Sequence, residues 1–358
     1  MEHSIYMRRA LDLALLGAGR VSPNPMVGAV VVHRGVIIGE GFHEIYGGPH
    51  AEPNAINSVK DDFLLSESTL YVTLEPCSHW GKTPPCAELI LQKKIPKVVV
   101  GCVDPFAMVS GRGIAMLRQG GVDVEVGILS KECLELNRYF IVSNTKNRPY
   151  IILKYAQTKD GYIDGCRTQN MPAKWMTGPA AKVYVHRLRA HTDAIEVGRV
   201  TVEKDNPLLT VRDFYGNTPL RITIDRELRL PVSASVFDNS AATILFTKKE
   251  NQLIGTRKFA SCSMVEVVGL DTLREILAEL KDRKIQSLVV EGGACLLQSF
   301  VDENLWDELQ LFTAPIKLCD LYPDLDPLKG VRAPVINTNL VQIAKISEIG
   351  LEIFRNNI

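Results

Sequence analysis

Three side chains with metal-binding chemistry lie in the first quarter of the sequence: His50, Cys77 and Cys86. An imidazole and two thiolates are borderline-soft ligands of the kind that zinc prefers. A catalytic zinc site uses three protein ligands and leaves its fourth tetrahedral position to water, whose pKa falls to about 7 on the metal. The pattern therefore predicts a catalytic zinc site.

Glu52 lies two residues after the predicted histidine ligand, near the start of a predicted helix over residues 51–59. From there its carboxylate can reach the water without binding the metal. We predict that Glu52 takes a proton from water as hydroxide attacks an amidine carbon, and passes that proton to the departing amine, so that ammonia leaves. Cys77 also precedes a helical stretch, whose N-terminus favours a thiolate over a thiol.

The spacing of the two cysteines departs from the usual zinc-deaminase pattern, in which only two residues separate them. Here Pro76 precedes Cys77 as expected, but residues 78–85 lie between the cysteines. This longer loop can hang over a pocket, where His79 and Lys82 can contact a substrate. The alternative is a structural zinc site with four protein ligands, for which His79 is the nearby candidate.

Alternating strand and helix patterns surround these residues. In the first 145 residues we predict strands over 26–32, 36–41, 70–74, 97–103 and 122–126, and helices over 51–59, 86–94 and 113–119. We expect the strands over 26–32 and 36–41 to form a hairpin around Arg34 and Gly35. Helices packed on a mostly parallel sheet fit the order as a whole.

A polar stretch over residues 144–149 separates a second α/β region from the first. There we predict strands over 150–155, 194–198, 221–225, 243–247, 287–291, 308–313 and 351–354, and helices over 179–190, 271–284 and 294–301. We therefore expect one domain over residues 1–145 and another over residues 149–358.

The composition narrows the classes of partner. The 41 basic and 41 acidic side chains balance, which excludes the broad basic field of a duplex nucleic-acid binder and argues against a deaminase of nucleic-acid bases. The best apolar run, over residues 26–32, is too short to cross a membrane. Eight cysteines do not form the dense framework of a small secreted protein, so we expect a reduced, cytoplasmic setting. We expect a small-molecule partner, no nucleic acid or membrane partner, and a homo-oligomer.

Longer motifs occur in both halves of the sequence. The first half carries Pro-Asn-Pro-Met-Val-Gly at 23–28, Pro-His-Ala-Glu at 49–52, Leu-Glu-Pro-Cys-Ser-His at 74–79 and Gly-Lys-Thr-Pro-Pro-Cys at 81–86. The second half carries Lys154, Asp-Gly at 160–161, Trp-Met-Thr at 175–177, Asp-Asn-Pro at 205–207, Leu-Thr-Val-Arg at 209–212 and Glu-Gly-Gly at 291–293. Together these motifs resemble those of the bifunctional riboflavin-biosynthesis deaminase-reductases, over nearly the whole chain.

The resemblance implies an α/β protein with a cytidine-deaminase-like N-terminal domain followed by a dihydrofolate-reductase-like C-terminal domain. The first domain would use zinc to hydrolyse the 2-amino group of 2,5-diamino-6-(5-phosphoribosylamino)pyrimidin-4(3H)-one. The second would use NADPH to reduce the ribosyl group of the product to ribityl, giving 5-amino-6-(5-phosphoribitylamino)uracil. The same likeness repeats the zinc ligands and the role of Glu52, and it adds a deaminase substrate pocket of Asn24, His43, His79, Lys82 and Asp104.

For the second domain the resemblance implies two sets of contacts. The phosphoribosyl substrate would contact Ala173, Arg189, Asp205, Leu209, Arg212 and Glu291. NADPH would contact Ala156, Trp175, Thr201, Asp205, Gly293, Ala294, Cys295 and Leu296. The residues themselves add that no Gly-x-Gly-x-x-Gly follows a strand, which leaves a Rossmann-type site unsupported. Gly292 and Gly293 before a helix form either a phosphate cradle or a plain tight turn.

Three features of the second half depart from the family pattern. Lys159 replaces a usually apolar residue, Ala173 stands where a serine or threonine is common, and the loop over residues 162–174 is longer than usual. These departures keep open a second hypothesis, in which only deamination survives and the C-terminal domain is a ligand-binding or dimerising module.

Overall fold

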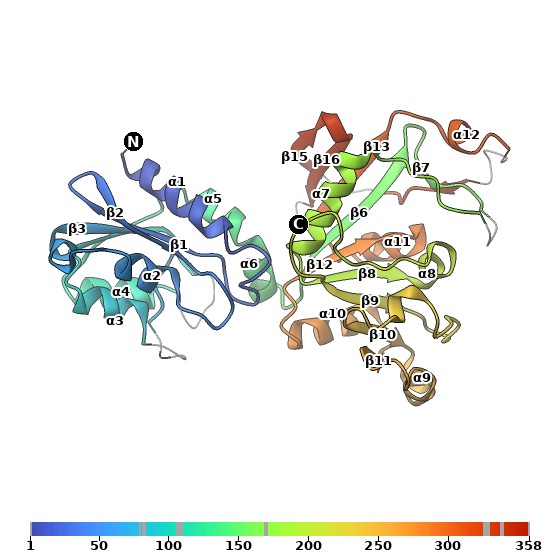
Figure 1. Cartoon of the computed structure of the whole chain (residues 1–358), viewed down its shortest axis with the longest axis horizontal. Helices are drawn as coiled ribbons and strands as arrows, with labels where there is room; N and C mark the ends of the chain where they lie inside the picture. Colours follow the sequence, from blue (N-terminus) through green and yellow to red (C-terminus); the bar gives the residue numbers. More distant parts are fainter. Residues whose placement is uncertain are drawn as a thin grey trace. The chain divides into compact units, whose positions relative to one another are not determined.

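The computed structural model shows a chain that divides into two compact units, Met1–Arg148 and Pro149–Ile358 (Figure 1). The structure describes residues 2–78, 80, 84–104, 110–167, 171–324, 330–336 and 340–356. Each unit has its own sheet and its own apolar core. Each therefore has the layered architecture of a separately packed domain.

The first unit is built on a mixed five-stranded sheet with the order β2-β1-β3-β4-β5. Its strands are β1 (Gly28–His33), β2 (Val36–Phe42), β3 (Ser68–Leu74), β4 (Lys97–Cys102) and β5 (Asp123–Val126). β1 pairs antiparallel with β2 and β3, whereas β3, β4 and β5 run parallel. β2, β3, β4 and β5 thus run in one direction and β1 alone is reversed, which confirms the mostly parallel sheet expected from the sequence. Arg34 and Gly35 both have positive φ, as a two-residue hairpin turn requires, and such a turn forces β1 and β2 to run antiparallel.

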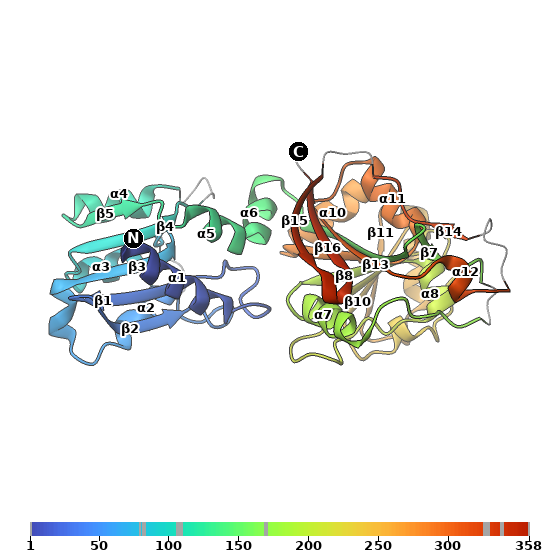
Figure 2. The ribbon, with the colours of Figure 1, turned by 90° about the horizontal axis from the view of Figure 1, so that it is seen from above.

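Helices cover both faces of this sheet (Figure 2). They are α1 (Glu2–Leu15), α2 (Ala51–Asn57), α3 (Cys86–Gln92), α4 (Arg112–Gln119), α5 (Ser130–Leu136) and α6 (Arg138–Thr145). α1 and α5 share one apolar cluster with the strands, and α2, α3 and α4 share the other. α5 and α6 were not predicted from the sequence. In α6 the aromatic and β-branched run over residues 139–142 is more typical of a strand.

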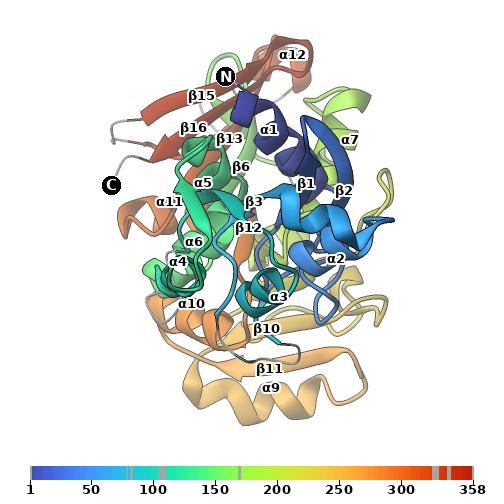
Figure 3. The same ribbon diagram turned by 90° about the vertical axis from the view of Figure 1, so that its left-hand side faces the viewer.

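The second unit is built on a nine-stranded sheet with the order β11-β10-β9-β8-β12-β6-β13-β16-β15. Its strands are β6 (Tyr150–Thr158), β8 (Ala194–Gly198), β9 (Leu220–Ile224), β10 (Thr243–Thr247), β11 (Val265–Gly269), β12 (Ser287–Glu291), β13 (Glu308–Ala314), β15 (Leu340–Ile346) and β16 (Leu351–Asn356). The strands from β11 to β13 in this order run parallel. β13, β16 and β15 pair antiparallel and lie side by side at one edge (Figure 3).

A separate two-stranded sheet pairs β7 (Tyr162–Asp164) with β14 (Val331–Arg332). The start of the predicted loop over residues 162–174 is therefore a strand. Residues 168–170 of that loop lie outside the described chain.

The helices of the second unit also lie on both faces of its sheet. They are α7 (Pro179–Ala190), α8 (Arg199–Asp205), α9 (Gln252–Lys258), α10 (Leu273–Asp282), α11 (Ala294–Asp302) and α12 (Leu318–Leu321). α10 and α11 pack on one face, and α7 packs on the other. Because β8, β12 and β6 are parallel neighbours, their carboxyl ends meet at one edge, where open α/β sheets bind ligands.

Glu196 is an unusual member of this sheet. Its side chain is fully buried in β8, and neither carboxylate oxygen has a hydrogen-bond partner among the described residues. Burial raises the pKa of Glu196 from 4.5 to about 8. Between these two pH values the unfolded chain has lost the proton and the folded chain keeps it. The free energy of unfolding therefore falls as the pH rises through this interval, by up to about 1.4 kcal/mol per pH unit.

We expect Glu196→Gln to remove this fall, because the amide does not ionise in either state. Urea unfolding of the two proteins between pH 5 and pH 8 measures the difference. Glu250→Gln, which changes a carboxylate that is 75% exposed, should keep the wild-type slope. An unchanged slope in Glu196→Gln would mean that burial does not hold the proton on this carboxyl group.

Candidate functional site

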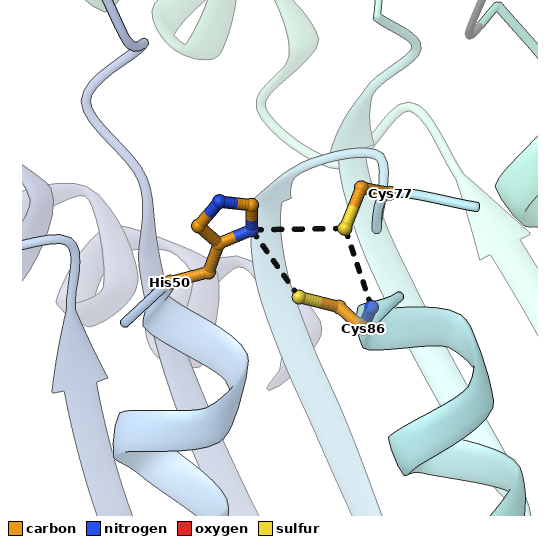
Figure 4. A group of neighbouring side chains, drawn as sticks. All are labelled: His50, Cys77 and Cys86. Carbon is orange, nitrogen blue, oxygen red and sulfur yellow. Dashed lines mark hydrogen bonds between the residues drawn. The ribbon is translucent and has the colours of Figure 1, made fainter. Parts of the chain in front are cut away.

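The three predicted metal ligands converge in the first unit, with His50, Cys77 and Cys86 placing their ligand atoms within 4.8 Å of one another (Figure 4). His50 Nδ1 lies 3.7 Å from Cys77 Sγ and 3.4 Å from Cys86 Sγ. Tetrahedral zinc, with bonds of about 2.3 Å to sulfur and about 2.0 Å to nitrogen, sets such separations at about 3.5 Å. The spacing and the donor atoms therefore fit a zinc ion.

Two helix starts and one strand end bring these side chains together. His50 immediately precedes α2, Cys86 is the first residue of α3, and Cys77 follows the end of β3. α2 lies directly against β2, because a Cβ atom on Gly41 would come within 2.2 Å of the backbone nitrogen of Ala55. Only glycine fits there, so Gly41 sets the depth of α2 and with it the position of His50.

Cys77 is held as a thiolate by its neighbours. Its Sγ accepts the backbone N–H of Cys86 at 3.2 Å, which is a donor of the first turn of α3. The hydrogen bond from the Cys86 thiol, together with the His50 imidazole, lowers the pKa of Cys77 to about 4. The same pairing raises the pKa of Cys86, and the hydrogen bond with Cys77 raises that of His50. The cluster thus concentrates negative charge on sulfur, which suits a divalent cation.

Glu52 lies in the first turn of α2 and is 3% exposed. Burial, and the nearby sulfur of Cys77, raise the pKa of Glu52 to about 7. Its carboxyl group is close enough to Cys86 that it also helps to raise the pKa of that thiol. Glu52 does not join the group of ligand atoms, and among the described residues no fourth His, Cys, Asp or Glu does so. The carboxyl group is therefore a neighbour of the cluster and not one of its ligand atoms.

Two of the predicted pocket residues form a hydrogen-bonded pair beside the cluster. Asn24 Nδ2 donates to His43 Nε2 at 3.0 Å, and His43 Nδ1 donates to the carbonyl oxygen of Pro49 at 2.8 Å. Burial lowers the pKa of His43, in keeping with the neutral ring that this bonding pattern requires. The pair holds the residue directly before His50, and the two histidine rings lie 5.5 Å apart.

The other predicted pocket residues are placed only in part. Asp104 is buried and follows β4, the neighbour of β3 in the sheet. His79 and Lys82 lie outside the described residues. Their contacts with substrate, and the fourth-ligand alternative for His79, therefore stay predictions.

Glu75 is a buried residue of this site that was noted from the sequence only within a motif and was given no role. Its carboxylate accepts the backbone N–H groups of Asp104, Gly111, Gly113 and Ile114, at 3.3, 2.9, 2.9 and 3.3 Å. Three of these donors lie at the start of α4, so the carboxylate caps that helix. A Cβ atom on Gly113 would lie 1.9 Å from the carbonyl oxygen of Pro76, so the segment before Cys77 rests directly on the helix. The available signal was an acidic residue between a buried strand and a predicted ligand.

The second unit places a charged cluster at the carboxyl ends of its parallel strands. Arg189 of α7 donates to Glu291 Oε2 at 2.9 Å, and Glu291 ends β12. Burial opposes ionisation of Glu291, but Arg189 and Lys154 lower its pKa to about 2. Lys154 is the register partner of Glu291 on β6, and burial lowers the pKa of its amine. Lys154 was noted from the sequence only as part of the motif set, although a charged residue within an apolar strand was the available signal.

Arg212 is held near the same strand ends by a hydrogen bond to α7. Its backbone N–H donates to His186 Nδ1 at 2.9 Å, while its exposed guanidinium donates to Thr210 Oγ1 at 3.0 Å. Arg189 also donates to the Thr210 carbonyl oxygen, at 3.4 Å. Leu209 anchors the segment, because it is buried and its φ is +57°. The structure thus brings four of the predicted substrate residues together, namely Arg189, Leu209, Arg212 and Glu291.

Most of the predicted NADPH residues lie along this edge as well. Gly292 and Gly293 have positive φ and lead into α11, which begins with Ala294, Cys295 and Leu296. A Cβ atom on Gly292 would meet Thr201 Oγ1 at 2.8 Å. No described side chain caps α11, so its first N–H groups can receive a phosphate.

The other residues predicted to contact NADPH or the substrate make no side-chain hydrogen bond to this edge within the part of the chain that the structure describes. Ala156 packs in the apolar cluster under α7. Asp205 ends α8, and Ala173 and Trp175 are exposed, Trp175 by 76%.

Comparison with known proteins decides the family. A model described as the RibD C-terminal domain matches residues 149–349, and a model described as the cytidine and deoxycytidylate deaminase zinc-binding region matches residues 1–102. The riboflavin biosynthesis protein RibD of Aquifex aeolicus is 43% identical over 312 residues, which cover 87% of this chain and 86% of the relative. The chain belongs to the RibD family.

Other RibD proteins agree over the full length. The RibD of Bacillus amyloliquefaciens is 38% identical over 355 residues, covering 97% of this chain and 94% of its own. The solved structure of a diaminohydroxyphosphoribosylaminopyrimidine deaminase/5-amino-6-(5-phosphoribosylamino)uracil reductase from Thermotoga maritima is 38% identical, covers 99% of both chains and has a TM-score of 0.85. A RibD structure from Acinetobacter baumannii is 31% identical, covers 99% of this chain and 98% of its own, and has a TM-score of 0.86.

These matches confirm the family and the fold class expected from the sequence, a cytidine-deaminase-like domain followed by a dihydrofolate-reductase-like domain. The RibD C-terminal match does not favour the alternative in which only the deaminase half is active. In the ranges that the structure covers, no helix combines the length and the apolar character needed to cross a bilayer.

The role of Glu75 gives a prediction for this RibD site. Glu75→Gln keeps the size of the side chain but turns one acceptor into a donor that faces backbone N–H groups. We expect the free energy of unfolding of the first unit to fall by about 1–3 kcal/mol. We also expect zinc to pass to a chelating dye faster, because the segment before Cys77 is no longer fixed.

Glu67→Gln is the matched control, since it changes a carboxylate in the same unit that is 60% exposed. Zinc should leave this control at the wild-type rate. A wild-type rate in Glu75→Gln as well would contradict the supporting role of Glu75.

Proposed function

We propose that this chain is a bifunctional enzyme of riboflavin biosynthesis. Residues 1–145 would deaminate 2,5-diamino-6-(5-phosphoribosylamino)pyrimidin-4(3H)-one with zinc. Residues 149–358 would then reduce the ribosyl group with NADPH to give 5-amino-6-(5-phosphoribitylamino)uracil. The observation that carries the proposal is the convergence of His50, Cys77 and Cys86 beside the buried carboxyl group of Glu52, in a chain of the RibD family.

In the deaminase half, His50, Cys77 and Cys86 would hold the zinc ion. Zinc, when bound, supplies a Lewis acid that makes water nucleophilic near neutral pH. The chain itself contributes the proton transfers. Glu52 accepts a proton from the water that attacks the 2-amino carbon, and gives it to the amino nitrogen as the C–N bond breaks. One water is consumed and one ammonia is released, while a carbonyl oxygen replaces the amine.

The deaminase pocket would be completed by residues from several loops. Asn24 and His43 stand beside the cluster, and Asp104 lies at the end of the neighbouring strand β4. His79 and Lys82 belong to the long loop between the two cysteines. This loop is where the chain differs from deaminases with a two-residue spacing, and it would contact the phosphoribosyl group of the substrate.

In the reductase half, the side chains would mainly orient two bound molecules, and NADPH, when bound, supplies the hydride. Arg189 and Arg212 would bind the substrate phosphate, for which a planar guanidinium is well suited. Glu291 fixes the Arg189 guanidinium at 2.9 Å. Ala173, Asp205 and Leu209 would complete the substrate site.

The cofactor phosphates would lie on the backbone N–H groups at the start of α11. This assigns Gly293, Ala294, Cys295 and Leu296 to NADPH. Ala156, Trp175, Thr201 and Asp205 would contact the rest of the cofactor.

Incubation of the purified, zinc-loaded chain with the diaminopyrimidine and NADPH tests the proposal. We expect equal amounts of ammonia released and NADPH oxidised. Ammonia without NADPH oxidation would remove the reductase half of the proposal, and neither product would remove both halves. The cytoplasmic location and the homo-oligomeric state remain predictions from the sequence.

Glu52→Gln should abolish ammonia release while the protein keeps its zinc. The expected loss exceeds the 10²–10⁴-fold effect that is roughly typical of one positioned acid or base, because Glu52 serves two proton transfers. Ammonia assays and atomic absorption give the two measurements. Near-normal ammonia release would contradict the proposed role.

Two comparison variants sharpen this test. Cys86→Ser should lose zinc and ammonia release together, because it removes a ligand. Glu44→Gln, on the exposed turn before His50, should lose neither. In all three proteins, NADPH oxidation with the deaminated substrate should stay normal, since the second unit is unchanged.

Arg189→Lys tests the reductase site. Lysine keeps the positive charge but lacks the planar fork that spans Glu291 and Thr210. We expect the KM for the deaminated substrate to rise by roughly tenfold or more. Arg187→Lys, on the exposed side of the same helix, is the control and should leave the KM unchanged. Equal KM values for Arg189→Lys and wild type would show that Arg189 does not bind the substrate.

A further inference from the structure

Arg167 is a buried cation in the second unit that nothing in the proposed reaction uses. Only 3% of its side chain is exposed. Its Nε lies 2.8 and 2.9 Å from the two carboxylate oxygens of Asp164, and its Nη2 donates to Asp205 Oδ1 at 2.6 Å. Its Nη1 donates to the carbonyl oxygen of Met171 at 3.0 Å. One guanidinium therefore joins two carboxylates from distant parts of the chain.

The same cluster fixes the stretch of chain that leads to Trp175. The Tyr322 hydroxyl, directly after α12, donates to Asp164 Oδ1 at 3.2 Å and accepts the backbone N–H of Lys174 at 3.3 Å. The Lys174 ammonium lies 5.1 Å from the centre of the Tyr322 ring. β7, the residues before Trp175 and the end of α12 are thus tied to one another.

The contact with Arg167 stabilises the negative charge of Asp205 and fixes its position. Its carboxylate lies at the C-terminal end of α8, where the partial negative charge of the helix disfavours another negative charge. Arg167 offsets this repulsion and fixes Oδ1. In the described ranges no hydrogen-bond donor reaches Oδ2, and the side chain is 34% exposed. One oxygen is held still while the other is available to accept a hydrogen bond.

We propose that Arg167 is a positioning residue of the reductase, which holds the Asp205 carboxylate so that its free oxygen accepts a hydroxyl group of a bound ligand. This inference rests on the proposed function, which assigns Asp205 to both the phosphoribosyl substrate and NADPH. Both ligands carry sugar hydroxyls, so the chemistry recognised is the same. Arg167 lies in the stretch over residues 162–174 that departs from the family pattern.

Reductase kinetics of the full-length, zinc-loaded chain test the inference. With the deaminated substrate supplied directly, we expect Arg167→Gln to raise a KM by roughly tenfold to hundredfold, the range for loss of a charged hydrogen-bonding group, and to change kcat less. A rise in the KM for NADPH would show that the hydroxyl belongs to the cofactor. A rise in the KM for the deaminated substrate would show that it belongs to the substrate. Ammonia release from the first unit should stay normal in the same preparation, which shows that the first unit is folded and zinc-loaded. The retained kcat of reduction shows that the second unit, which contains Arg167, is folded.

Tyr322→Phe is the matched control. It removes the hydroxyl that binds Asp164 and Lys174 but leaves the contact between Arg167 and Asp205. We expect its KM values to stay near those of wild type. If Tyr322→Phe and Arg167→Gln raise KM equally, the cluster acts by tethering the chain, and the positioning of Asp205 is overturned.

A double-mutant cycle shows whether Arg167 acts through Asp205. We expect Arg167→Gln combined with Asp205→Asn to be no worse than Asp205→Asn alone. Multiplied effects would overturn the inference. Arg167→Lys, which keeps a cation but cannot reach both carboxylates, should be intermediate, and it serves as the test if Arg167→Gln does not fold.

The outcomes separate this inference from the proposed function. If Asp205→Asn impairs reduction but neither Arg167 variant does, only the inference fails. If Asp205→Asn has wild-type kinetics, the assignment of Asp205 in the proposed function is wrong, and the inference falls with it.

Discussion

The buried carboxylate of Glu75 is the constraint on which the metal-binding part of the molecule depends. It collects four backbone N–H groups from the end of β4 and the start of α4, and it stands two residues before Cys77. A buried N–H group without an acceptor is costly, so these chain segments cannot separate without a large loss of free energy. The position of the Cys77 sulfur is therefore fixed relative to the central strand β3. The other two ligands begin helices, and helix starts packed on a sheet are equally fixed.

Both units place their charged groups at the ends of strands and helices, but the sign of the charge that each site attracts is opposite. In the first unit, sulfur, nitrogen and a buried carboxyl group gather at strand and helix ends, where together they attract a cation. In the second unit, Arg189, Lys154 and the open start of α11 gather around Glu291 at the carboxyl end of β12, where they would attract the anionic groups of the proposed ligands. In the second unit a buried carboxylate, that of Glu291, keeps the cations in place. In each unit some charged groups of the proposed site are thus already paired within the protein, Cys77 with His50 in the first and Arg189 with Glu291 in the second.

The sequence predicted those features that depend on residue type and on long regular patterns. The predicted strands over 194–198, 243–247 and 287–291 match β8, β10 and β12, and the predicted helix over 179–190 matches α7. The zinc ligands were predictable because few residue combinations have their chemistry. Contacts between distant residues were not predictable. Glu75 meets its partners 29 to 39 positions later, and Arg167 meets Asp205 across 38 positions, so neither role leaves a local pattern.

The contact between Gly41 and α2 links two functions of the site, metal binding by His50 and proton transfer by Glu52. His50 and Glu52 ride on one helix start, whose height above the sheet is set by the absence of a side chain at position 41. A Cβ atom there would meet the backbone of Asn54 and Ala55, so it would push against the helix that carries both groups. A substitution at position 41 would therefore affect zinc binding by His50 and proton transfer by Glu52 together. A second substitution that restores both would have to change the packing between β2 and α2.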